Sequence, residues 1–283
     1  MTDTLRLKLG ISYDGTGFHG WARQKPKGGE ELRTVQGEIE KALSLVLRHP
    51  VELTVAGRTD AGVHAAGQVA HVDVPVESLA QRSIDGDPTR LVRRLSKLLP
   101  EDVRVRSCEE APRDFDARFS ALRRHYVYRV STDPAGPLPT RRRDTATWTR
   151  PVDVDRLNEA AAMLIGLHDF AAFCKPKPHA TTVRDLQSFV WVDASSPLEP
   201  QVLEAHLSAD AFCWNMVRCL VGASLMVGDG RRDLGFIAQL MKETQRSSAV
   251  PVAQARGLTF VGVEYPPEEE LAARAAVTRD RRE

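Results

Sequence analysis

The amino-acid sequence predicts an α+β protein of two lobes, each built on an antiparallel or mixed sheet with helices on one face, and with a central cleft. Three observations lead to this prediction. The 283 residues are enough for two domains of roughly 100–150 residues each. Hydrophobic residues make up 42% and charged residues 27% of the chain, which is the balance of a globular protein. Segments of alternating and of helical period follow one another in both halves.

The first half is expected to run strand, helix, strand, strand, helix, strand. Alternation predicts the strands, and apolar residues at helical spacing predict the helices. The six segments are strand 5–14, helix 34–48 with Thr34 as its N-cap, strand 51–56, strand 68–74, a helix opened by Asp87 and Pro88, and strand 103–108. This order is the split βαβ pattern of ferredoxin-like folds, which RNA-recognition domains share.

The second half also mixes strands and helices. We expect strand 125–131, a helix over about 155–165 ended by Gly166, paired strands 186–192 and 202–209, helices 216–227 and 234–242, and strand 258–264. Three regions follow from these elements: an N-terminal lobe over 1–110, a C-terminal lobe over 111–265, and a charged tail over 266–283. The tail is low in large apolar residues and is expected to be a frayed helix or disordered.

Charge is distributed unevenly along the chain. The net charge is only +1, from 39 basic and 38 acidic residues, which excludes a protein that is basic throughout. Residues 113–150, however, contain nine arginines and four aspartates, a net +5. Arginine suits two-pronged contacts to phosphate, so this segment is typical of a nucleic-acid-binding surface, although a solvated surface remains the alternative.

Targeting signals and cysteine pairs are not evident in the sequence. No apolar run approaches the roughly 20 residues of a membrane span, and the N-terminus lacks the basic and apolar regions of a secretory signal. We therefore expect a cytoplasmic protein without a membrane partner. None of the four cysteines forms a C-x-x-C pair, so reduced thiols and no metal site are expected.

Residues 57–65, GRTDAGVHA, form the densest unusual segment. Glycines bracket a short polar run between two predicted strands, and such loops allow close approach of a ligand. Asp60 would be presented at the sheet edge, and Arg58 could keep its carboxylate ionised and oriented, as a nucleophile requires. Spacing alone favours a turn in which the aspartate caps its own backbone.

Five ordered segments, reaching from residue 5 to about 265, resemble the tRNA pseudouridine synthase A family. They are residues 13–21 (YDGTGFHGW), residues 57–70 (GRTDAGVHAAGQVA), residues 115–120 (FDARFS) with 126–128 (YVY), residues 215–222 (NMVRCLVG), and Gly257 with Leu258. Two departures from the family pattern are Ala22, where glutamine is common, and a long polar loop at 25–33. Both bear on RNA docking rather than on the reaction.

The resemblance implies roles for four residues. Asp60 would be the catalytic aspartate, and Tyr126 the active-site tyrosine that stacks on the target base. Arg58 and Arg218 match basic positions expected near that aspartate. The resemblance further implies that the protein isomerises uridine to pseudouridine at nucleotides 38–40 of the tRNA anticodon stem-loop, and that it is a homodimer whose subunits grip one tRNA.

This reaction breaks the bond between C1′ and N1 and joins C1′ to C5 without redox change, so it demands neither cofactor nor metal. A carboxylate can hold one fragment covalently, at C1′ or at C6, while the base is reoriented. A general base must then remove the C5 proton, and Tyr126 is a candidate. A stacked uridine must first be flipped out, at a cost of a few kcal/mol.

Two other functions are compatible with parts of the sequence. A metal-dependent nuclease could use Asp60, His64, His71 and Asp73. The cations Arg58 and Arg118 and the poor ligand spacing count against it. A non-catalytic RNA-binding module could use a ferredoxin-like sheet, but the chain lacks the basic–aromatic run of such readers.

Overall fold

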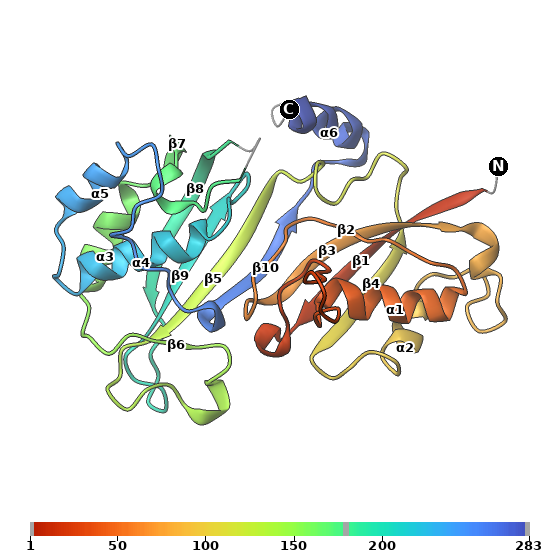
Figure 1. Cartoon of the computed structure of the whole chain (residues 1–283), viewed down its shortest axis with the longest axis horizontal. Helices are drawn as coiled ribbons and strands as arrows, with labels where there is room; N and C mark the ends of the chain where they lie inside the picture. Colours follow the sequence, from red (N-terminus) through yellow and green to blue (C-terminus); the bar gives the residue numbers. More distant parts are fainter. Residues whose placement is uncertain (1–2, 178–180, 281–283) are drawn as a thin grey trace. The chain divides into compact units, whose positions relative to one another are not determined.

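The computed structural model describes residues 3–177 and 181–280 of the chain. The described residues form two compact units, one of residues 3–122 with 260–280 and the other of residues 123–177 with 181–259 (Figure 1). The sequence placed the boundary near residue 110 and treated the tail separately. In the structure the last strand, β10 (Leu258–Glu264), brings the chain back to the first unit.

The first unit has the predicted order of elements. They are β1 (Thr4–Tyr13), α1 (Val35–Leu47), β2 (Thr54–Val55), β3 (His64–Pro75), α2 (Arg90–Leu95) and β4 (Val103–Glu110). β1 lies between β3 and β4 and is antiparallel to both, while β2 pairs antiparallel with β3. Thus β1–α1–β2 and β3–α2–β4 are each split βαβ units, as the sequence predicted.

Alternation and capping explain the first two elements. Leu7, Leu9 and Ile11 of β1 are all within 1% of complete burial, so one face of the strand forms the core. Thr34 caps α1 by accepting a hydrogen bond from the backbone N–H of Gly37. Each fully buried leucine contributes roughly 1.5–3 kcal/mol to stability.

The C-terminal segment forms a docked helix where the sequence suggested fraying or disorder. β10 pairs with β3, and α6 (Leu271–Asp280) follows it. Leu271 is 4% exposed and packs with Phe115 and Ala117. Only tertiary contact stabilises this helix, because its own sequence has little apolar periodicity.

In the second unit the strands follow the order β5-β9-β8-β7, and each is antiparallel to its neighbour. Its elements are β5 (Arg123–Ser131), β6 (Ala146–Thr147, parallel to β5), α3 (Val154–Ala162), β7 (Gly166–Asp169), β8 (Val183–Asp193), β9 (Val202–Ala209), α4 (Met216–Gly228) and α5 (Leu234–Leu240). Asn158 of α3 exchanges two hydrogen bonds with the backbone of Trp191, at 2.8 and 3.0 Å. The indole of Trp191 donates to Ser224 of α4, so both helices are attached to β8.

Short 3-10 turns complete the described chain. They lie at Gly15–Gly17, Val76–Leu79, Pro139–Arg141, Ala171–Phe173, Ala255–Gly257 and Glu268–Glu270. None of the helices among the described residues is both long and apolar enough to cross a membrane.

One expectation about the cysteines is wrong. Cys174 and Cys213 form a disulfide, while Cys108 and Cys219 are free and buried. The backbone N–H of Lys175 donates to the carbonyl of Trp214 at 2.9 Å, and this hydrogen bond holds the two cysteine-containing segments side by side. The paired cysteines are separated by 39 positions, which hides their proximity in the sequence.

Candidate active site

The loop between β2 and β3 carries two of the four predicted site residues, Asp60 and Arg58. Asp60 is half-buried and Arg58 is exposed, whereas Thr59 between them is buried. The Asp60 carbonyl accepts a hydrogen bond from the N–H of Val63 at 3.1 Å, which closes a turn. Gly62 has φ +78°, a conformation that glycine adopts without strain. The loop is therefore a tight turn that leaves a carboxylate and a guanidinium near its tip.

Buried hydrogen bonds beneath the loop fix its backbone. The Tyr13 hydroxyl lies 2.7 Å from the Thr59 hydroxyl, and the Gln68 side chain donates to the Gly57 carbonyl at 2.8 Å. Gln68 also donates to the Tyr13 hydroxyl at 3.4 Å and is completely buried. Such a network holds geometry firmly because every broken bond would leave a polar group unsatisfied away from water.

The same burial sets the protonation of Tyr13. Burial raises the pKa of Tyr13 to about 12, while the hydrogen bonds from Thr59 and Gln68 act in the opposite direction. The phenol therefore remains neutral at physiological pH, when it can both donate and accept a hydrogen bond.

A second loop, residues 14–21, contacts the Asp60 loop. Its Trp21 N–H donates to the Thr59 carbonyl at 3.0 Å. A Cβ added to Gly15 would lie 2.0 Å from the Val63 carbonyl oxygen, and one added to Gly20 would lie 2.8 Å from the Thr59 carbonyl oxygen. Both positions require glycine because backbone approaches backbone directly.

The beginning of α1 is tied to this pair of loops. The first helical N–H groups, of Val35 and Gln36, donate to the carbonyls of Gly20 and Trp21 at 3.2 and 3.0 Å. These donors have no partner within the helix, so the loop satisfies them. Backbone hydrogen bonds thus connect the start of α1 to the 14–21 loop and, through it, to the Asp60 loop.

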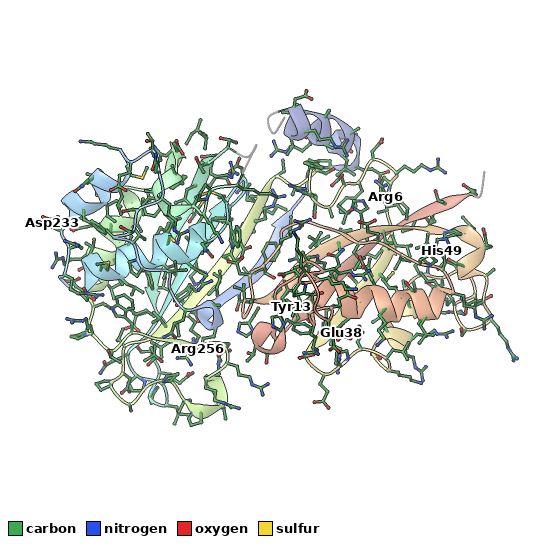
Figure 2. The ribbon with its side chains drawn as sticks, in the orientation of Figure 1. Arg6, Tyr13, Glu38, His49, Asp233 and Arg256 are labelled. Atoms are coloured by element: carbon green, nitrogen blue, oxygen red, sulfur yellow. A yellow bond between two sulfur atoms is a disulfide. The ribbon has the colours of Figure 1, made fainter. Side chains whose placement is uncertain are left out.

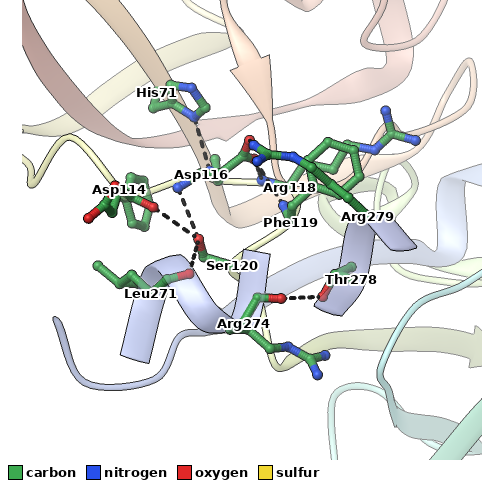
Figure 3. A network of polar contacts seen from close by, with 12 residues as sticks. His71, Asp114, Asp116, Arg118, Phe119, Ser120, Leu271, Arg274, Thr278 and Arg279 are labelled. Atoms are coloured by element: carbon green, nitrogen blue, oxygen red, sulfur yellow. Dashed lines mark hydrogen bonds and ion pairs between the residues drawn. The ribbon is translucent and has the colours of Figure 1, made fainter. Parts of the chain in front are cut away.

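Positive charge accumulates beside the loop. Burial lowers the pKa of Arg118, and the positive charge of Arg58 lowers it further. Asp116 fixes the backbone at Arg118 by accepting from the N–H groups of Arg118 and Phe119 at 2.8 and 2.9 Å, and Arg279 of α6 binds Asp116 at 2.9 Å (Figure 3). The C-terminal helix therefore supports a guanidinium close to that of Arg58, and two neighbouring cations favour an anionic ligand.

Tyr126 and Arg218 belong to the second unit. Tyr126 lies on β5 opposite Leu207, and its buried ring meets Phe212 edge-on at 5.1 Å between centroids. Arg218 lies on α4, where its Nε donates to the Ala253 carbonyl at 2.6 Å. Asp60 and Arg58 share one loop of the first unit, whereas Tyr126 and Arg218 stand on separate elements of the second.

Sequence reasoning missed the supporting residues Tyr13, Thr59 and Gln68. All three lie within the segments that carry the family resemblance. Gln68 alone gave a usable signal, because a glutamine at a core-facing strand position needs a specific hydrogen-bond partner.

The residues of the nuclease alternative serve other purposes here. His71 Nδ1 accepts from the Ala117 N–H at 3.0 Å, and both carboxylate oxygens of Asp73 bind Arg6, at 2.7 and 2.6 Å. His64 Nδ1 accepts from the Gly15 N–H at 3.0 Å. Across residues 3–177 and 181–280, His, Cys, Asp and Glu form no group of three that could hold a metal ion. The proposed ligand set is therefore not assembled in the described chain.

Comparison with known proteins identifies the family. The family model described as tRNA pseudouridine synthase matches residues 11–120 and 160–266. A protein named tRNA pseudouridine synthase A from Corynebacterium glutamicum is 62% identical over 279 residues, covering 99% of this chain and 96% of that protein. Proteins of the same name from Frankia casuarinae and Mycobacterium leprae are 52% and 50% identical, with at least 99% of this chain and 96% of each relative covered. The chain therefore belongs to the tRNA pseudouridine synthase A family.

Proposed function

We propose that this protein isomerises uridine to pseudouridine in tRNA, with Asp60 as the nucleophile. One observation carries the assignment of the nucleophile. Asp60 follows directly after Thr59, whose side chain and carbonyl are both held by hydrogen bonds within the first unit. A carboxylate on so constrained a backbone can meet a reacting atom with little loss of orientation.

The chemistry conserves every atom of the substrate. The Asp60 carboxylate forms a bond to C1′ or C6, and the bond between C1′ and N1 breaks. C1′ then bonds to C5, and the bond to Asp60 breaks, which frees the carboxylate. The C5 proton leaves to a base and N1 gains a proton, so no oxidant or reductant is consumed. In this proposal Tyr126 stacks on the uracil and is the candidate for receiving the C5 proton, while Arg58 and Arg218 keep Asp60 ionised.

The proposed substrate is the anticodon stem-loop, with uridines at nucleotides 38–40 as targets. Family membership and the names of the relatives support tRNA as the substrate. The net charge of +5 over residues 113–150 supports contact with the phosphate backbone. We further propose a homodimer that binds one tRNA in the cytoplasm and requires no metal or cofactor.

The test uses an unmodified tRNA transcript carrying tritium at C5 of uridine, incubated with the full chain in EDTA. We expect tritium to pass into water as C5 loses its proton. Asp60→Asn, which keeps the shape of the side chain, should release less than one thousandth as much while binding tRNA within a few-fold of the original chain. Release by that variant at a comparable rate would contradict the role of Asp60.

The same assay locates the target. Transcripts that keep a single uridine at nucleotide 38, 39 or 40 should release tritium, and a transcript with cytidine at all three should release none. Release from the last transcript would place the target elsewhere in the tRNA.

A further inference from the structure

A cationic pocket lies at the far end of α1 from the Asp60 loop. Its volume is about 530 Å³. The lining residues are Arg48, Gln81, Arg82, Ser83 and Arg94, so three of the five are arginines and none is acidic. A hollow of this size accommodates a phosphate group with its neighbouring sugar.

The fold holds the walls of this pocket in place. Arg48 ends α1 in a left-handed conformation, with φ 55°. The Gln81 side chain donates to the carbonyls of Val46 and Ser78, at 2.8 and 3.0 Å, and so fastens the 78–83 segment to the helix end. Arg94 of α2 donates to the hydroxyl of Ser83.

The positive charge of the pocket is not neutralised locally. Asp85 and Asp87, the nearest carboxylates in sequence, both pair with Arg90, at 3.1 and 3.6 Å. Within the described residues, no carboxylate lies within ion-pair distance of the three pocket arginines. Three guanidiniums around one hollow repel each other, and an anion would relieve that repulsion. Phosphate suits them because guanidinium can contact two of its oxygens at once.

The length of α1 fixes how far the pocket is from the chemistry. The helix starts at the catalytic loops, through Val35 and Gln36, and ends at the pocket, through Arg48. Figure 2 labels Glu38 near the start of α1 and His49 beyond its end. At 1.5 Å per residue, the 13 residues of α1 span about 20 Å.

We infer that this three-arginine pocket binds backbone phosphates of the RNA whose uridine is modified at Asp60. The inference rests on the proposed function, and it adds a contact outside the basic segment 113–150. An RNA stem carries a phosphate at every base pair along each strand, so a stem engaged at Asp60 has backbone phosphates about 20 Å away, at the distance of the pocket. Such contacts set the register and orientation of the RNA and carry no sequence information.

The test compares the double variant Arg82→Gln/Arg94→Gln with Arg93→Gln. Arg93 is an exposed arginine on the same helix as Arg94 that does not line the pocket, so it controls for loss of charge. The Kd for a full-length tRNA transcript is measured between about 50 and 200 mM salt. We expect the double variant to bind roughly 10-fold more weakly near 150 mM salt, and the slope of log K against log salt to become shallower by about 1–2. Arg93→Gln should stay within two-fold.

Arg82→Gln alone guards against a folding defect. Arg82 is exposed and makes no hydrogen bond within the described chain, so its replacement should leave the melting temperature unchanged and still shift the salt slope by about 0.7–0.9. Equal Kd values and slopes for the pocket variants and Arg93→Gln would overturn the inference.

A second arm separates RNA from a free anion. Inorganic phosphate is titrated into the original chain and the double variant by calorimetry. Phosphate binding that the double variant loses, with no change in tRNA affinity, would assign the pocket to a small anion and overturn the inference. Tritium release at saturating tRNA is measured in parallel. Its absence from the original chain would refute the proposed function, whereas the salt slopes report on the pocket alone.

Discussion

The two ends of α1 are built in contrasting ways. At its start, the Asp60 loop is held by hydrogen bonds that involve Tyr13, Thr59 and Gln68. Gly15 and Gly20 allow the backbone of the 14–21 loop to lie directly against the backbone of the Asp60 loop. At its end, Arg48 lines a pocket together with two other arginines, and no acidic residue lines that pocket. One end is held in place by internal hydrogen bonds, and the other leaves positive charge for a ligand to neutralise.

This contrast separates two functions of the same helix. Internal hydrogen bonds fix where the carboxylate stands, which affects the rate of the chemical step. Uncompensated surface charge affects how tightly and in which orientation an anionic substrate binds. Changes at the first end should therefore alter kcat, and changes at the second should alter Kd and its dependence on salt.

Among changes to the residues that support the Asp60 loop, the largest effect is expected from Gly15→Ala. The new Cβ would lie 2.0 Å from the Val63 carbonyl oxygen, so one of the two loops must move by more than 1 Å. A displacement of that size near the reacting group can cost about 100-fold in rate. Steady-state tritium release and thermal unfolding check this. Gly29→Ala is the matched control, because its Cβ would meet only Pro26 at an ordinary 3.4 Å. Equal activity of the two variants would show that the loops tolerate separation.

A smaller effect is expected from removing one hydroxyl beneath the loop. Thr59→Val keeps the shape of the side chain and should lower kcat by roughly 10-fold with KM for tRNA within two-fold, because loss of the hydrogen bond to Tyr13 is expected to cost about 1.4 kcal/mol. Thr59→Ser keeps the hydroxyl and should restore most of the rate.

A double-mutant cycle separates positioning from a general loss of stability. Tyr13→Phe removes the same hydrogen bond from its other side, together with the longer one from Gln68, so the Tyr13→Phe/Thr59→Val pair should be little worse than Tyr13→Phe alone. Strictly additive losses would mean that the two hydroxyls act independently, against a shared network.

The smallest effect concerns alkaline pH. The pKa of Tyr13 is about 12 in the folded protein because of burial, against about 10 in an unfolded chain. Between these values the unfolded state loses the proton first, so the stability contributed by this group is present below pH 10 and is lost as pH rises toward 12. The loss amounts to about 1.4 kcal/mol by pH 11.

Urea unfolding of the original chain and of Tyr13→Phe, at pH 8 and pH 11, measures that loss. Burial also raises the pKa of Cys108 to about 12, but this thiol contributes equally in both proteins. The free energy of unfolding should therefore fall more steeply with pH in the original chain. Identical slopes would indicate that Tyr13 is accessible to solvent.

Local signals predicted much of the fold. Thr34 was expected to cap a helix, and it does so with its own side chain. Strand 202–209 and the last strand have the expected bounds.

Local sequence gave wrong bounds where backbone N–H groups form hydrogen bonds with side chains of another element. The strand expected at 51–56 shrinks to Thr54–Val55, because the N–H groups of Val51 and Leu53 donate to Ser44 and Glu40 of α1. Likewise, the helix expected to end at Gly166 ends at Ala162, and Gly166 begins β7.

The surroundings of the candidate site were predictable to a lesser degree. The motif around Asp60 indicated the loop, since an aspartate flanked by glycines and basic residues can be recognised from the sequence alone. The pocket was not predictable, because Arg48, Arg82 and Arg94 meet only after α1 and α2 fold onto the sheet. The same holds for α6, whose contacts reach back to Ser120 and Asp116 (Figure 3).

The most direct test of this account is a single-turnover measurement with enzyme in large excess over tritiated tRNA, made on Thr59→Val and on Arg82→Gln/Arg94→Gln. At saturating enzyme the pocket variant should reach the rate of the original chain, since its defect lies in binding, whereas Thr59→Val should remain roughly 10-fold slower. A pocket variant that stays slow at saturation, together with a Thr59→Val variant that reaches full rate, would contradict the division of roles between the two ends of α1.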